Sequence, residues 1–391
     1  MTNHAHPRIP AHLNRRQFLG RGGVALGGLA LGPAFLSACG DDSDSSSSGS
    51  GSVKQDTKNL YFANWPAYID KETVKLFEQQ SGISMKYTEE YNDNNEYFAK
   101  IQPLLSKGKK IDPDMIAPTF WMAGRLINLG WVDKLELAKI PNAKNLRAAL
   151  QKPTWDPTGE YSLPWQSGFA GIAYNISVTG RELTSIDDLW DPAFKGKIGV
   201  LTEMRDTLGL LGLSEGVDIS KPTAKSLQKA LDLLQEQVDK GQVGAFTGND
   251  YMDRLSQGNF AACIGWSGDI AQLSKDNPDA RFVIPDSGGT LWSDTMVVPK
   301  GSDGADTAAE FMNYVYDPVN AARITAFVQY VSPVEGVQDE LRKMGGDAAA
   351  IAEDELLFPT EAQSANLTSF GPLSDADEEK LDAEFSKIQG N

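Results

Sequence analysis

The chain has 391 residues, of which 53 are acidic and 36 are basic, and this length favours two domains over one. All three histidines and four of the arginines precede residue 39, so the rest of the chain has 32 basic against 53 acidic residues, a formal charge of −21, and no imidazole. From residue 39 onward this excludes Ser-His-Asp and Cys-His nucleophile pairs and histidine-rich metal sites, argues against nucleic acid as a partner, and is compatible with a cationic ligand.

The first 38 residues have the pattern of an export signal. Arg15 and Arg16 precede Phe-Leu and then an apolar run, residues 24–36, which is too short to span about 30 Å of hydrocarbon. The arginine pair resembles a twin-arginine signal, and the Leu-Ser-Ala-Cys that ends at Cys39 resembles a lipobox. We therefore expect residues 1–38 to be a signal peptide, and Cys39 to be lipidated and to anchor the exported protein at the outer face of the cytoplasmic membrane or in the periplasm.

Residues 39–57 are rich in Ser, Gly and Asp, which predicts a flexible tether between this anchor and a folded body. If Cys39 is lipidated, Cys263 is the only other thiol, so the body has no internal disulfide. Because Cys263 lies in an apolar run, we expect it to be buried and inert.

From residue 58 onward, short apolar runs alternate with amphipathic helices, which is typical of an α/β protein. A helix is expected over residues 70–80, with Asp70 as its N-cap and Gly82 just beyond its end. A second, long helix is expected over residues 222–240, begun by Pro222. The remaining expected elements are a helix at 96–107 and strands at 60–63, 83–87, 115–117, 171–174, 198–201, 261–265, 282–284 and 296–298.

Aromatic and acidic residues follow or precede several of these strands, where the loops of two α/β lobes would face each other across a cleft. In chain order they are Trp65, Tyr68, Trp121, Glu203, Asp206, Trp266, Asp269, Trp292 and Asp294. Aromatic faces attract ammonium groups by roughly 0.5 to 2 kcal/mol, and carboxylates form charge-assisted hydrogen bonds of about 1.5 to 3 kcal/mol. Such a slot suits a linear polyamine, although Asp206 and Asp269 could instead cap the helices that follow them.

Three ordered motifs resemble those of the spermidine/putrescine-binding proteins of ABC importers. They are Asn64-Trp65-x-x-Tyr68, Gly265-Trp266-Ser267-Gly268-Asp269 and Trp292-Ser293-Asp294 before an apolar strand. The resemblance extends from about residue 58 to the C-terminus. It implies the α/β periplasmic-binding-protein fold, with two lobes that close on a ligand in the cleft between them. Lobe 1 would comprise residues 58–166 and 293–341, and lobe 2 residues 167–292 and 342–391.

The resemblance also implies roles for individual residues. Trp65, Tyr68 and Trp292 would stack on the polyamine, Trp266 and Asp269 would hold it from lobe 2, and Asp294 would bind an amine. Further positions of the family site are matched by Thr119, Trp121, Glu203, Asp206 and Tyr330. The partners implied are the polyamine and an ABC permease in the membrane. We expect a monomer with no catalytic residue, no cofactor, no metal and no nucleic acid.

Two alternatives remain at this point. The same fold could bind another small solute, such as a sugar, an opine or a quaternary amine. A carboxylate-dependent glycoside hydrolase outside the cytoplasm is also compatible with a chain that has no histidine after its leader.

Overall fold

The computed structural model describes residues 56–91, 94–248 and 250–390. The predicted signal peptide, the lipidation at Cys39 and nearly all of the predicted tether lie outside these residues. Within them, no helix is both long and apolar enough to cross a bilayer.

The chain begins with a small α/β unit. Its elements are β1 (Asn59–Asn64), α2 (Lys71–Ser81), β2 (Ser84–Glu89), α3 (Asn94–Leu105), β3 (Met115–Ile116), α4 (Phe120–Asn128) and β4 (Val132–Asp133). The α2 caps are as predicted: the Asp70 carboxylate accepts from the N–H of Thr73, and Gly82 ends the helix at φ 73°. β1 pairs in parallel with both β2 and β3, so the loops after β1 and β3 lie at the same edge of the sheet.

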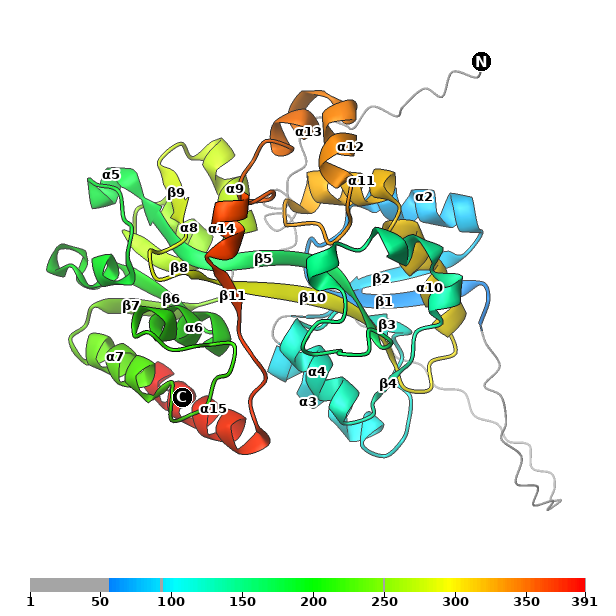
Figure 1. Cartoon of the computed structure of the whole chain (residues 1–391), viewed down its shortest axis with the longest axis horizontal. Helices are drawn as coiled ribbons and strands as arrows, with labels where there is room; N and C mark the ends of the chain where they lie inside the picture. Colours follow the sequence, from blue (N-terminus) through cyan, green and yellow to red (C-terminus); the bar gives the residue numbers. More distant parts are fainter. Residues whose placement is uncertain (1–55, 92–93, 249, 391) are drawn as a thin grey trace, which may run out of the picture.

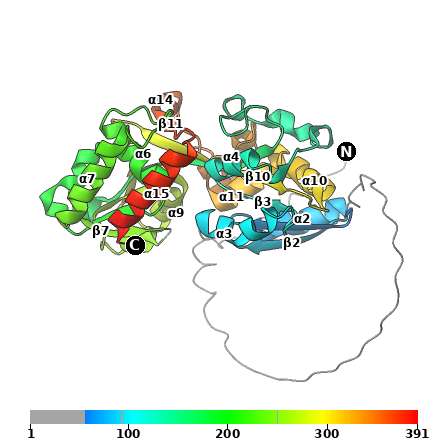
Figure 2. The same cartoon turned by 90° about the horizontal axis from the view of Figure 1, so that it is seen from below.

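Two long strands run through the centre of the molecule. β5 (Ser162–Asn175) and β10 (Gly289–Pro299) pair antiparallel and occupy the middle of the strand order β2-β1-β3-β10-β5-β8-β6-β7. Figure 1 shows them running from one half of the molecule into the other, and Figure 2 shows the two halves from below. The sheet is therefore continuous across both halves.

The second half contains most of the α/β elements between β5 and β10. They are α5 (Ile176–Thr179), β6 (Ile198–Leu201), α6 (Met204–Ser214), α7 (Gln228–Asp239), β7 (Val243–Thr247), α8 (Tyr251–Ser256), β8 (Ala262–Trp266), α9 (Ser267–Asp276) and β9 (Ala280–Val283). After β10 come α10 (Ala305–Val315), α11 (Pro318–Val328), α12 (Val337–Met344), α13 (Gly346–Ile351), α14 (Glu361–Ala365), β11 (Leu367–Ser369) and α15 (Asp375–Gln389). Five short 3-10 helices, η1 (Leu137–Lys139), η2 (Pro141–Asn145), η3 (Ala148–Leu150), η4 (Ile186–Trp190) and η5 (Pro192–Phe194), lie in the connections.

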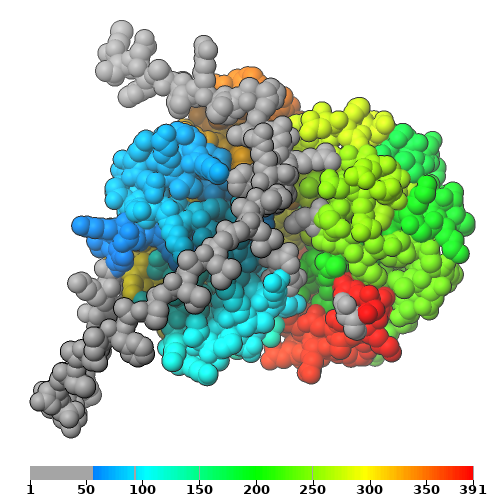
Figure 3. Space-filling view, turned by 180° about the vertical axis from the view of Figure 1, so that it is seen from behind, coloured from blue at the N-terminus to red at the C-terminus, as the bar shows by residue number. Residues whose placement is uncertain are grey.

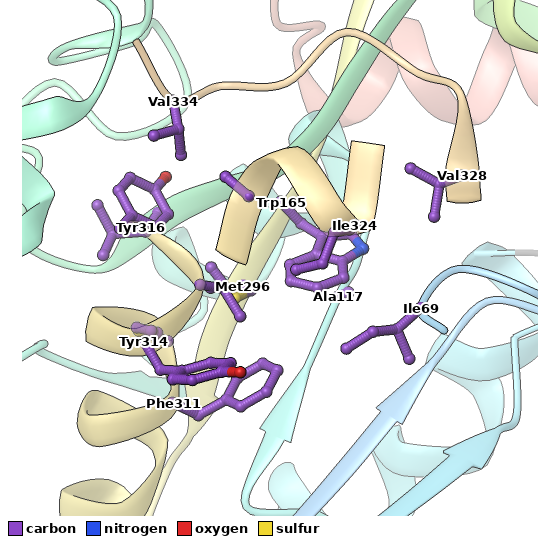
Figure 4. Packing of buried hydrophobic residues seen from close by; sticks show 14 of the residues in the cluster. Ile69, Ala117, Trp165, Met296, Phe311, Tyr314, Tyr316, Ile324, Val328 and Val334 are labelled. Atoms are coloured by element: carbon purple, nitrogen blue, oxygen red, sulfur yellow. The ribbon is translucent and has the colours of Figure 1, made fainter. Parts of the chain in front are cut away.

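The buried side chains of the two halves form separate hydrophobic clusters. The first cluster lies between the sheet and α10 and α11, where Phe311 packs 5.7 Å from Phe62 and 6.2 Å from Trp165 between ring centroids (Figure 4). The second cluster surrounds β6 and β8, and includes Cys263, which is a free thiol with no exposed surface. The prediction that Cys263 is buried is confirmed, and burial raises the pKa of its thiol, which disfavours the reactive thiolate. A third cluster fills the space under α3 and α4.

The predicted long helix is wrong at its start. Residues 222 and 223 have no regular structure, residues 224–227 form turns, and α7 begins only at Gln228. Here the side chains of Thr223 and Ser226 exchange hydrogen bonds with each other's backbone, and Asp377 accepts from the N–H of Ala224 at 2.9 Å. These side-chain contacts compete with helical hydrogen bonding, which Pro222 alone does not reveal. The strands expected at 171–174 and 296–298 are likewise only the ends of β5 and β10.

Candidate functional site

The site is built on one face of β10, where Thr290, Trp292 and Asp294 occupy alternate positions and therefore share a side of the sheet. Trp292 pairs with Gly168 of β5. A Cβ at Gly168 would lie 2.4 Å from Cζ2 of Trp292, so the absence of a side chain lets the indole lie directly against the β5 backbone. This places an aromatic face midway between Thr290 and Asp294.

Asp294 receives hydrogen bonds from two loops of the first half. The hydroxyl of Tyr68, after β1, donates to one carboxylate oxygen at 2.8 Å, and the hydroxyl of Thr119, after β3, donates to the other at 2.7 Å. Asn94 in turn donates to the Thr119 hydroxyl at 2.9 Å. Asp294 is 7% exposed. Its carboxylate is therefore oriented at both oxygens in a largely buried position.

Asp206, in the first turn of α6, is held on the other side of Trp292. Its carboxylate accepts from the indole N–H of Trp266 and from the hydroxyl of Thr290, both at 2.7 Å. Burial raises the pKa of Asp206, an effect that the two hydrogen bonds and the nearby charge of Arg205 oppose. Strand β10 thus links two acidic groups: it carries Asp294 itself, and its Thr290 binds Asp206.

Asp269, in the first turn of α9, is the third buried carboxylate. Tyr251 donates to one of its oxygens at 2.9 Å and Tyr330 to the other at 2.6 Å. Burial, together with the charge of Asp269, holds the pKa of Tyr251 well above its ordinary value, so this hydroxyl stays a donor. Tyr330 comes from the segment after α11, so Asp269 joins parts of the chain from both hydrophobic clusters.

The helix-cap alternative for Asp206 and Asp269 is wrong. The N-cap of α6 is Glu203, whose carboxylate accepts from the N–H of Arg205 at 3.3 Å, and the N-cap of α9 is Trp266, whose side chain does not cap the helix. Both aspartates lie inside their helices and bind side chains from elsewhere in the chain. Among the predicted site acids, Glu203 is the one that caps a helix.

The predicted aromatic residues lie around these acids. Trp65 donates its indole N–H to the carbonyl of Ala117 at 2.8 Å, and its ring lies 5.0 Å from that of Tyr91. Trp292 lies 5.3 Å from Tyr330, nearly perpendicular to it. The indoles of Trp65, Trp266 and Trp292 are all partly exposed. Trp121 differs, because the guanidinium of Arg205 lies 3.6 Å from its ring centroid.

Taken together, these contacts place the site on the boundary between the two hydrophobic clusters. Tyr68, Thr119 and Asp294 meet on one side; Asp206 and Trp266 meet on the other; and Tyr330 with Asp269 joins them. A family model described as bacterial extracellular solute-binding protein matches residues 72–359.

The chain belongs to this family. The spermidine/putrescine-binding periplasmic protein of Escherichia coli K12 is 23% identical to this solute-binding protein over 337 residues, which cover 86% of this chain and 88% of that protein. The putrescine-binding periplasmic protein SpuD of Pseudomonas aeruginosa UCBPP-PA14 is 27% identical over 363 residues, covering 85% and 92%. A solved structure of the spermidine/putrescine ABC transporter substrate-binding protein PotD from Streptococcus pneumoniae matches with a TM-score of 0.72 at 24% identity, covering 85% of this chain and 99% of that one.

These similarities confirm two predictions. The structural match confirms the α/β periplasmic-binding-protein fold, and the sequence matches confirm the resemblance carried by the three motifs. Membership in a family of solute-binding proteins also confirms that the chain is a binding protein and not an enzyme, so the glycoside hydrolase alternative is set aside.

Three residues that position the acids of this solute-binding protein were not predicted from its sequence: Asn94, Tyr251 and Thr290. Thr290 could have been found, because it lies two residues before Trp292 on the same strand face. Tyr251 gave no signal, since it reaches Asp269 from the start of a different helix, α8. Within the described ranges no group of three or more His, Cys, Asp or Glu side chains is placed to hold a metal ion.

Proposed function

We propose that this solute-binding protein is the polyamine-binding component of an ABC importer, and that it holds spermidine or putrescine between its two halves. The observation that carries the proposal is the convergence of three buried carboxylates, those of Asp206, Asp269 and Asp294, around partly exposed indoles. Hydroxyl and indole donors fix the direction of each carboxylate without cancelling its charge. That arrangement is matched to a ligand that carries several ammonium groups on an apolar chain.

The two kinds of side chain serve different parts of such a ligand. Carboxylates bind the terminal ammonium groups through charge-assisted hydrogen bonds of about 1.5 to 3 kcal/mol. The faces of Trp65 and Trp292 bury the methylene groups and attract the flanking cations. A neutral sugar would leave the buried carboxylates without a cation, which disfavours its binding.

The names of the curated relatives support the same solute class. The Escherichia coli protein is named for spermidine and putrescine and the Pseudomonas aeruginosa protein for putrescine. We propose that the three motifs shared with that family perform the same task here: Trp65, Tyr68 and Trp292 stack on the chain, and Asp269 and Asp294 bind amines. Thr119 and Asp206 complete the site, whereas Glu203 and Trp121 act through their contacts with Arg205.

Calorimetric titration of the body, residues 56–391, tests the function. Putrescine, cadaverine, spermidine and spermine are titrated separately, with glucose, an opine and choline as representatives of the alternative solutes. We expect saturable binding of at least one polyamine and none of the others at the same concentrations. Tight binding of a neutral sugar, an opine or choline with no polyamine binding would reject the proposal.

We further propose that Cys39 carries the lipid anchor and that the twin-arginine signal directs export. A diacylglycerol together with an added acyl chain supplies the two or more chains that stable anchoring requires. Replacement Cys39→Ser should release the protein from the membrane fraction or leave its signal uncleaved, while Cys263→Ser should leave fractionation unchanged. If Cys39→Ser still fractionates with the membrane as a processed protein, the anchor lies elsewhere.

A further inference from the structure

Arg205 is a buried cation at the edge of the proposed site. It is the residue before Asp206 in the first turn of α6 and is only 6% exposed. Its guanidinium lies 3.6 Å from the ring centroid of Trp121, on α4, and donates to a carboxylate oxygen of Glu378, on α15, at 2.9 Å. Three elements that are far apart in the sequence therefore meet at this one side chain.

The surroundings of Arg205 have the composition of an ammonium subsite. An aromatic face and a carboxylate are the two groups that bind an amine elsewhere in the site, and here Trp121 and Glu378 supply them. Glu378 is also 3.8 Å from the guanidinium of Arg125, on α4, so two arginines of the chain hold it. Figure 3 shows the C-terminal helix, in red, beside a cyan segment of the first half. This subsite is thus filled by the chain's own cation.

The spacing along β10 gives the scale of the interval between two of the acids. Residues 290 and 294 are four positions apart, so their Cα atoms are about 13 Å apart at a rise of about 3.3 Å per residue. The Thr290 hydroxyl donates to the Asp206 carboxylate, and Asp294 is the second acid, so we take this Cα separation as the approximate interval that a ligand would bridge. A four-carbon diamine, with extended bonds of about 1.5 Å, separates its nitrogens by roughly 6 Å. Adding about 3 Å for the hydrogen bond at each end gives about 12 Å.

A triamine does not fit the same interval. Spermidine has nine bonds between its terminal nitrogens instead of five, so its extended length with two hydrogen bonds is roughly 17 Å by the same arithmetic. Its third ammonium would have to lie beyond the acid at one end. At the Asp206 end, the guanidinium of Arg205 is near enough for its charge to act on the Asp206 carboxylate, and the same charge repels a second cation.

We propose that Arg205 makes the cleft selective for short α,ω-diamines over triamines, because its guanidinium occupies the Trp121–Glu378 subsite that a third ammonium would need. The inference rests on the proposed function, since it concerns which polyamine that site takes. It assigns to Arg205 a role in specificity and not in binding the diamine itself.

The experiment compares dissociation constants for putrescine, cadaverine, spermidine and spermine in the wild-type protein and in Arg205→Gln. The wild type should bind a diamine about tenfold more tightly than spermidine, or more. The reason is that repulsion between like charges in the cleft lowers the affinity for spermidine by more than a factor of ten. Arg205→Gln should narrow that ratio by about tenfold, chiefly through a gain in spermidine affinity. Arg205→Lys keeps the charge and should keep the preference.

Arg181→Gln is the matched control. Arg181 also pairs with acids, Asp188 and Asp191, and lies 5.8 Å from an aromatic ring, that of Phe194, but it is on the outer surface. Its replacement removes the same charge and should leave the diamine-to-spermidine ratio unchanged. Thermal melts establish that each variant is folded. Should Arg205→Gln fail to fold, Arg205→Met, which also removes the charge and keeps an unbranched side chain against Trp121, should narrow the ratio in the same direction.

Several outcomes overturn the inference. Spermidine affinity equal to or above putrescine affinity in the wild type rejects it without any variant, as does an unchanged ratio in folded Arg205→Gln. Tighter binding of 4-aminobutyrate than of putrescine would show that Arg205 binds a ligand carboxylate instead. Failure of the proposed function has a different signature, because the wild type would then bind no polyamine at all.

Discussion

Asp294 is bound by Tyr68 and Thr119, side chains that lie 226 and 175 residues away from it in the sequence. Asp206 and Asp269 are bound in the same manner, each by two donors from other segments. At the scale of single residues the protein's own donors therefore fix the direction of each carboxylate. A ligand that meets fixed acceptors loses less free energy to ordering side chains, which favours affinity.

The first prediction concerns Asp294. Replacement Asp294→Asn leaves a ligand ammonium buried without its charged partner, which typically costs about 2 to 5 kcal/mol. Since about 1.4 kcal/mol is a factor of ten, polyamine affinity should fall by roughly 30-fold or more. The matched control is Asp317→Asn, because Asp317 caps α11 and asparagine caps as well as aspartate. Calorimetric titration of both variants decides, and unchanged affinity in folded Asp294→Asn would contradict the assignment.

The second prediction concerns the pH dependence of stability at Asp206. Burial raises its pKa in the folded protein above the value of 3.8 that applies when it is unfolded. Protonation of Asp206 therefore stabilises the folded protein. This contribution to the free energy of unfolding is fully present below the pKa of the unfolded chain, and it is lost as the pH rises through the higher pKa of the folded protein. In the absence of ligand, Asp206→Asn should therefore raise Tm at pH 7, and the difference from wild type should shrink towards pH 3.8.

Asp218 is the control for this experiment, because its pKa is lowered by folding whereas that of Asp206 is raised. Hydrogen bonds from the side chain and backbone of Ser220 lower the pKa of Asp218, so its ionised form favours folding. Asp218→Asn should accordingly not raise Tm at pH 7. The same Asp206→Asn protein should bind polyamine more weakly, so a gain in stability would accompany a loss of affinity. A lower Tm for Asp206→Asn at pH 7 would show that its hydrogen bonds outweigh its burial.

At the scale of elements, the pairing of β5 with β10 determines where the central indole lies. Gly168→Ala would bring a methyl group to within 2.4 Å of Trp292 unless the ring moves. Such overpacking typically costs about 1 to 3 kcal/mol and would displace the stacking face. We expect a lower Tm and weaker polyamine binding. Gly248→Ala is the control, since its added methyl group meets nothing within 4 Å, and an equal effect of both changes would contradict this role for Gly168.

Local signals in the sequence were sufficient for some elements and not for others. Asp70 and Gly82 predicted the limits of α2 because capping depends on residues within the helix ends. Pro222 misled because the turns after it are held by Asp377, more than 150 residues away. β5 is buried along its whole length, so its sequence lacks the alternation that marks a half-exposed strand, and only its last part was predicted.

The site was predictable to a similar degree. Motif resemblance predicted Trp65, Trp266 and Asp294 as site residues, but not Tyr251, which donates to Asp269 and has no motif of its own. Nor did it find the contact of Arg205 with Trp121, because α4 and α6 meet only in the folded chain.

At the scale of the whole molecule, the packing suggests a change to the expected lobe boundaries. The boundary placed at residue 342 falls inside α12, and Leu357, later in the chain, is buried in the first hydrophobic cluster. Phe370 is buried in the second cluster. We propose that lobe 1 extends beyond α13 and that the chain returns to lobe 2 between Leu357 and Phe370. The crossings at β5 and β10 stay where the resemblance implied them.

The last prediction is closure of the two lobes on the ligand. A polyamine bound to Asp294 on one side and to Asp206 and Asp269 on the other favours the state in which all three contacts exist together. Putrescine or spermidine should therefore reduce the radius of gyration measured by small-angle scattering. It should also shift the tryptophan emission, since Trp65, Trp266 and Trp292 are partly exposed at the cleft.

The Asp294→Asn protein provides the control for closure. At a polyamine concentration that saturates the wild type but not this variant, it should show neither the change in scattering nor the shift in emission. At saturating concentrations both signals should return, because the lobes and the tryptophans are unchanged. Tight binding to the wild type with a constant radius and constant emission would mean that the ligand makes its contacts equally in both states. Since a ligand shifts a conformational equilibrium only by its difference in affinity for the two states, that result would exclude a closing clamp.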